Sequence, residues 1–136
     1  MARLIAILML GLGLVAGCAG GDSYVLIGGA EAASTAGTLE VEREAERTLL
    51  TIHLEFLPSP EQRQADLSTY VVWFITPQGK AIRGGKLVYE AAKREGHAEL
   101  EGPAAPYELL VTAESQESPQ QPSEFRVIAE PIVESR

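Results

Sequence analysis

Hydrophobic and polar residues alternate along much of this 136-residue chain, and the dominant period is two. Alternation at this period is typical of β-strands with one buried face, because successive side chains of a strand point to opposite sides. The clearest case predicts a strand whose apolar face carries Leu50, Ile52, Leu54 and Phe56. Its polar face carries Thr51, His53 and Glu55.

Residues 70–75 are apolar on both faces, which predicts a central strand covered from both sides. Trp73, the only tryptophan, lies in this strand, and we interpret it as a core residue packed between two sheets. A third strong strand is expected at 107–114. Weaker candidates are 24–27, 38–43, 86–89, 98–101 and 124–129.

Turn signals separate these strands. Residues 77–80, Pro-Gln-Gly-Lys, predict a tight turn. Pro60 at the first position of a turn predicts a short helical segment at 59–61, and residues 90–95 predict a hairpin tip. Residues 117–122 predict an exposed loop. The pattern therefore favours an all-β, Ig-like antiparallel sandwich of about seven to eight short strands.

The N-terminal segment has a different character. Arg3 precedes an apolar run over residues 4–14, and the small residues Val15-Ala16-Gly17 lead into Cys18, the only cysteine. This arrangement resembles the lipobox of bacterial lipoproteins. The resemblance implies a cleaved helical signal peptide over residues 1–17, cleavage between Gly17 and Cys18, and acyl chains on Cys18.

Two other interpretations of this segment explain it less well. A membrane-spanning helix requires about 20 apolar residues, and the run is shorter. An ordinary secretory signal would leave a lone thiol in an oxidising compartment. Lipidation explains both the position of Cys18 and the lack of a second cysteine.

The expected organisation is a lipidated flexible tether over 18–23 and a single β-sandwich domain over 24–136.

The charge of the mature chain bears on its partners. Once Arg3 is removed with the signal, the chain has 10 Lys and Arg against 19 Asp and Glu, and this negative net charge argues against nucleic acid as a partner. Membrane attachment is expected through the acyl chains on Cys18. By the lipobox resemblance, Ala19 implies the periplasmic face of the outer membrane; the alternatives are the outer face of the cytoplasmic membrane or the cell surface.

A second resemblance covers roughly residues 70–128. Its motifs are Tyr70 and Trp73, the turn at Gly79, Gly85-Lys86-Leu87, Thr112-Ala113-Glu114 and Pro122-Ser123. They resemble the extracytoplasmic C-terminal domain of anti-sigma-K factors and related Ig-like lipoproteins. The chain departs from that family after Glu114, where Ser115-Gln116 follow. The resemblance implies the sandwich and does not extend to sigma-factor binding.

Candidate chemistry is sparse. His53 and His97 have no partner at metal-ligand spacing, and no Gly-x-Ser-x-Gly nucleophile elbow is present, so neither a metal site, a cofactor nor an enzyme is expected. Glu40, Glu42 and Glu44 are interpreted as the charged face of a solvated edge strand.

The leading hypothesis is a lipid-anchored structural or interaction module with a possible protein partner in the envelope. The alternative is a small-ligand or envelope-stress sensing domain.

Overall fold

The computed structural model describes residues 21–134, and this part of the chain is all-β. Nine strands form two antiparallel sheets, and the described residues contain no α-helix. Two single-turn 3₁₀ helices, η1 (Ala30–Ala32) and η2 (Pro60–Gln62), lie in connections. The predicted all-β class is confirmed for these residues, with nine strands where seven to eight were expected.

The five-stranded sheet has the order β1-β2-β3-β7-β6. Its strands are β1 (Gly21–Ile27), β2 (Ala36–Arg43), β3 (Arg47–Glu55), β7 (Glu95–Pro103) and β6 (Val88–Glu90). The four-stranded sheet has the order β5-β4-β8-β9. Its strands are β5 (Ala81–Lys86), β4 (Thr69–Ile75), β8 (Tyr107–Glu114) and β9 (Arg126–Ile132).

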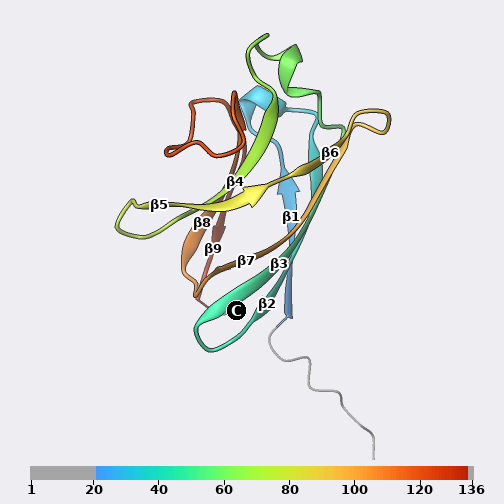
Figure 1. Ribbon diagram of the computed structural model, residues 1–136. Helices are drawn as coiled ribbons and strands as arrows, with labels where there is room; N and C mark the ends of the chain where they lie inside the picture. The colour runs from blue at the N-terminus through green and yellow to red at the C-terminus, as the bar shows by residue number, and fades with distance from the viewer. Residues whose placement is uncertain (1–20, 135–136) are drawn as a thin grey trace, which may run out of the picture.

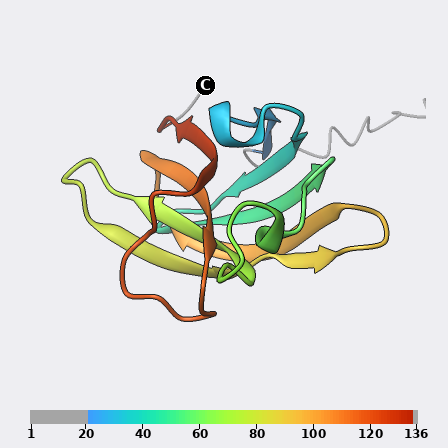
Figure 2. The same cartoon turned by 90° about the horizontal axis from the view of Figure 1, so that it is seen from above.

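The two sheets pack face to face around one main core (Figures 1 and 2). Alternate residues of each inner face meet there, as the period-two pattern requires. Fully buried members include Leu26, Leu39, Ile52, Leu54, Tyr70, Val72, Phe74, Leu109 and Val111. The ring of Phe74 meets that of Tyr107 edge-on, with centroids 5.1 Å apart, which joins β4 to β8 inside the core.

The predicted strands are present, and the turn at 77–80 and the hairpin tip before β7 are confirmed. The short helical segment expected at 59–61 is present one residue later, at Pro60–Gln62. The prediction that Phe56 lies on the buried face of its strand is wrong. Phe56 follows the end of β3 with a φ of 55° and is 59% exposed. The backbone changes direction there, and Leu57 fills the buried position instead.

The strand expected at 86–89 is two strands in two sheets. β5 pairs with β4, then the chain crosses at Leu87, and β6 pairs with β7. Leu87 is buried at the crossing, and its amide donates to the carbonyl of Tyr70. Gly85 has a φ of 147° next to a bulge in the β4–β5 ladder, a conformation that glycine adopts at least cost.

The N-terminal part of the domain differs from expectation at two places. β1 begins at Gly21, so residues 21–23 belong to a paired strand and not to a flexible tether. β2, expected at an edge, lies between β1 and β3. Glu40 and Glu42 remain exposed on it because they point away from the core, while Glu44 lies beyond the strand and pairs with Arg47.

Candidate functional site

The predicted cleavage and lipidation residues, Gly17 and Cys18, lie outside the described residues. Strand β1 begins three positions after Cys18. Among residues 21–134, no helix has the length and apolar character needed to cross a membrane.

Trp73 is buried, with 1% of its surface exposed, but it does not lie between the sheets. Tyr70, Val72 and Phe74 occupy the inner face of β4, so Trp73 occupies the outer face. There it forms a second, smaller apolar cluster with Val71 and Leu110. The sequence shows that both faces of β4 are covered; it does not show which face meets the other sheet.

The connection from β8 to β9 folds back over this outer face. Arg83, opposite Trp73 in the ladder, donates to the carbonyl of Pro119 at 2.6 Å. The indole N–H of Trp73 donates to Thr112 Oγ1 at 2.9 Å, and the Thr112 hydroxyl donates to the Glu114 carboxylate. Glu114 also accepts the amide of Ser123 at 2.8 Å. This chain of hydrogen bonds ties the returning loop to the sheet.

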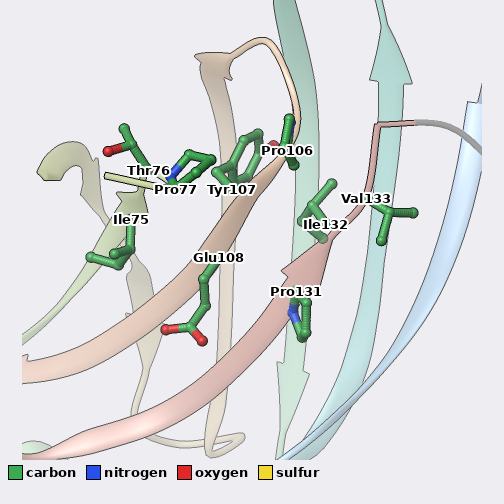
Figure 3. A pocket seen from close by; sticks show the side chains of 9 residues that line it. All are labelled: Ile75, Thr76, Pro77, Pro106, Tyr107, Glu108, Pro131, Ile132 and Val133. Atoms are coloured by element: carbon green, nitrogen blue, oxygen red, sulfur yellow. The ribbon is translucent and has the colours of Figure 1, made fainter. Parts of the chain in front are cut away.

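An open depression of about 350 Å³ lies at one end of the four-stranded sheet (Figure 3). Its wall is mainly apolar, and it is lined by Ile75, Thr76, Pro77, Pro106, Tyr107, Glu108, Pro131, Ile132 and Val133. Tyr107 is itself buried, which raises the pKa of its phenol, while a hydrogen bond with Thr48 acts in the opposite direction. Glu108 is the one charged side chain among the lining residues.

Arg43 joins the two ends of the described chain beside this depression. Its guanidinium contacts Asp22 Oδ2 at 2.8 Å and the Tyr24 hydroxyl at 3.1 Å, both on β1. It also donates to the carbonyls of Val133 and Glu134 at 2.7 and 2.6 Å. The Arg43 side chain is only 15% exposed, so this is a largely enclosed clamp between β1 and the segment after β9.

β1 is an edge strand with exposed apolar side chains. Val25 and Ile27 are 72% and 71% exposed. They point to the outer face, because Tyr24 and Leu26 occupy the inner face. An edge strand presents unpaired backbone N–H and C=O groups, so β1 offers both hydrogen bonds and apolar surface to another chain.

The two histidines lie directly opposite each other. His53 on β3 is the register partner of His97 on β7, and both point away from the core. His53 Nε2 lies 3.6 Å from Glu55 Oε1. Glu95 completes a group in which one ligand atom each of His53, Glu55 and Glu95 lie within 4.8 Å of one another.

Comparison with known proteins gives no relative for this chain. No protein-family model matches the sequence, no curated protein matches it, and no solved structure matches the fold. The fold and the geometry of residues 21–134 are therefore the observations that bear on function.

Two arrangements of side chains in the structure were not predicted from the sequence. The Arg43 clamp joins residues some 90 positions apart, and no local pattern signals it. The group around His53 has a partial signal. The period of two places His53 with Glu55, and Glu95 with His97, on single faces. The register between β3 and β7 then brings the two pairs together.

Proposed function

We propose that this chain is a lipid-anchored protein of the cell envelope whose β-sandwich acts by contact and not by catalysis. The observation that carries the proposal is strand β1. It is an edge strand, it exposes Val25 and Ile27, and it begins three positions after Cys18. One short segment thus joins the expected anchor to a surface suited to binding another chain.

We further propose that the sandwich is Ig-like. In such domains one sheet has the strand order A-B-E-D, and the other contains C, F and G. The orders β2-β3-β7-β6 and β5-β4-β8-β9 follow this arrangement with an additional strand C′, and β1 is an extra strand beside A. The order supports the resemblance to the extracytoplasmic domain of anti-sigma-K factors at the level of the fold.

Tyr107 gives a second argument for the Ig-like assignment. Ig domains carry a tyrosine near the start of strand F whose hydroxyl hydrogen-bonds back to upstream backbone. Tyr107 is the first residue of β8, and its hydroxyl lies 2.8 Å from Thr48 Oγ1. Thr48 in turn donates to the carbonyl of Pro103 at 2.9 Å, so the link to upstream backbone runs through one threonine.

The proposed anchor determines which end of the domain faces the lipid. Three Cα–Cα steps separate Cys18 from Gly21, which span at most about 11 Å. The end that bears Gly21, Arg43 and Val133 would therefore lie close to the membrane, and the hairpin between β6 and β7 would point away from it (Figure 1). We propose the periplasmic face of the outer membrane as the location, because Ala19 follows the cysteine.

Acylation is tested by feeding cells an alkyne-tagged fatty acid and measuring label on the wild-type chain and on Cys18→Ser. Label is expected on the wild type and absent from the variant, and mass spectrometry should find Cys18 as the first residue of the mature protein. Unlabelled wild-type protein, or equal label on Cys18→Ser, would contradict the anchor.

The contact surface is tested by crosslinking in intact envelopes. We expect an envelope protein to bind along β1 by adding a strand to its free edge. Val25→Lys with Ile27→Lys should then remove the crosslinked partner. Val88→Lys is the matched control, because Val88 is also an exposed apolar residue on an edge strand. Loss of the partner in the control alone would place the contact on β6, and retention in both variants would exclude β1.

The depression at the end of the four-stranded sheet favours a second candidate, a small-ligand or envelope-stress sensing domain. Apolar concave surfaces with few polar groups are typical of ligand sites. Its position beside the Arg43 clamp would couple a ligand to the β1 end of the domain. Val133→Arg, at an exposed residue of the wall, should abolish such binding, measured as ligand-induced chemical shifts at Tyr107.

A further inference from the structure

The outer face of the five-stranded sheet carries a cluster of metal-ligating side chains at β3 and β7. His53 lies opposite His97, and Leu54 lies opposite Gly96, so the next position along the ladder brings Glu55 beside Glu95. Because Leu54 and Gly96 are buried, the flanking residues on both strands point to solvent. A candidate ligand atom from each of His53, Glu55 and Glu95 lies within 4.8 Å of the others.

The surroundings of the two carboxylates are mostly apolar, neutral or acidic on the neighbouring strands. The register neighbours on β2 are Ala36, opposite Glu55, and Thr38, opposite His53. On β6, Val88 lies opposite His97 and Glu90 opposite Glu95. Lys93 pairs with Glu90 at 3.7 Å, but no Lys or Arg of residues 21–134 forms an ion pair with Glu55 or Glu95. Like charges opposed across a ladder destabilise it, so a cation between them would be favoured.

We propose that His53, Glu55 and Glu95 form a binding site for a divalent transition-metal ion of the Zn²⁺ type. The donor set is one imidazole nitrogen and two carboxylate oxygens, which suits borderline ions such as Zn²⁺ better than Ca²⁺ or Mg²⁺, which prefer oxygen alone. Three protein ligands leave at least one coordination position open to solvent. The His53 side chain is 44% exposed, so its imidazole is accessible to an ion from solvent.

His97 is positioned to add a fourth ligand. Directly opposed residues on one face of a ladder have Cβ atoms about 4.5–5.5 Å apart. His97 is exposed, so a change of rotamer can turn its imidazole toward the ion without moving the backbone. With it the site would be a tetrahedral His₂Glu₂ set; without it, the site keeps His53 and the two glutamates.

The test is titration of the full chain, purified in detergent with a tag free of histidine, with Zn²⁺ alone. One-to-one saturable binding is expected, with a rise in Tm of about 5 °C once Zn²⁺ exceeds its Kd tenfold. Because His53 and His97 are the only histidines, NMR of the imidazole nitrogens resolves both. The His53 signal should shift with Zn²⁺ and should not shift with Mg²⁺.

Variants identify the ligands. His53→Gln and Glu95→Gln should each weaken Zn²⁺ binding at least tenfold, whereas Glu130→Gln, a partly exposed carboxylate on β9 in the other sheet, should not. His97→Gln shows whether the fourth ligand is used. All these side chains are at least partly exposed, so Tm without metal should not fall in any of the variants, and this serves as the check of folding. Absence of saturable binding, or binding unaffected by His53→Gln and Glu95→Gln, would overturn the site.

Discussion

The hydroxyl group of Thr112 links three parts of the outer face of the four-stranded sheet. It accepts the indole N–H of Trp73 and donates its own proton to Glu114, whose carboxylate accepts the amide of Ser123. Thr112 is fully buried, and Glu114 is 5% exposed. A buried polar group that loses its hydrogen-bond partner lowers the stability of the fold by about 1–3 kcal/mol. Each group in this series of hydrogen bonds therefore depends on its neighbours.

Thr112→Val tests this dependence. The substitution keeps the side-chain shape but leaves the Trp73 N–H without an acceptor and removes one donor from Glu114. The free energy of unfolding, measured with urea, should fall by about 1–3 kcal/mol. Thr51→Val, on the exposed face of β3, is the control and should change stability by less than about 0.5 kcal/mol. Equal losses for the two variants would show that the hydrogen bonds of Thr112 do not contribute to stability.

Tyr70 makes stability depend on alkaline pH. Its phenol is buried and donates to the carbonyl of Pro58, and burial raises its pKa to about 12, with Arg63 acting in the opposite direction. The unfolded chain loses this proton near pH 10, and the folded chain retains it. The stabilising contribution is therefore complete below pH 10 and is lost as pH rises toward 12.

Tyr70→Phe should flatten this dependence. The wild type is expected to lose at most about 2.7 kcal/mol through Tyr70 between pH 10 and 12. At pH 7 the variant should be less stable by about 1 kcal/mol, because the hydrogen bond to Pro58 is gone. Urea unfolding at pH 8, 10 and 11.5, with phenolate absorbance followed in parallel, measures both effects. An unchanged slope would exclude Tyr70 as the source.

At the scale of elements, the sequence predicts strands better than it predicts how they meet. Residues 70–75 are apolar on both faces, and β4 is indeed covered on both. Yet the pattern does not show which face meets the other sheet, so the prediction that Trp73 lies between the sheets is wrong. The switch at Leu87 cannot be predicted for a related reason, because β5 and β6 are nearly continuous in sequence and only their pairing separates them.

The candidate sites were less predictable than the strands. A face of one strand is readable from alternation, so His53 and Glu55 could be grouped. Glu95 comes close to them only because of the register of β3 against β7, in which Leu54 lies opposite Gly96. The alternation within each strand does not define this register. Gly17 and Cys18 remain predictions of the sequence.

Arg43 holds β1 to the body of the domain. Arg43→Gln removes the contacts to Asp22 and to the carbonyls after β9. Amide exchange in β1 should then become at least tenfold faster, while β4 and β8 remain protected. Arg47→Gln is a matched control, because its pairs with Glu44 and Glu101 are about half exposed and contribute little. Equal effects of both variants on β1 would contradict the clamp.

At the scale of the whole molecule, one core couples both sheets, so the domain should unfold in a single step. Trp73 reports on the outer cluster, whereas circular dichroism reports on all strands. Because β4 carries Trp73 on one face and the main core on the other, the two transitions should coincide in urea. Fluorescence that changes at lower urea would show that the loop over Trp73 opens independently.

The pairing of β1 with β2 also has a mechanical consequence if the chain is anchored at Cys18, as we propose. Seven register pairs join the two strands, beginning at Gly21. Tension applied at Gly21 along the strand axis loads these pairs together, in shear, and Arg43 passes part of that force to the segment after β9. A sideways pull would break the same pairs one after another. Under the proposed anchor, this pairing would resist a force that draws the domain away from the membrane.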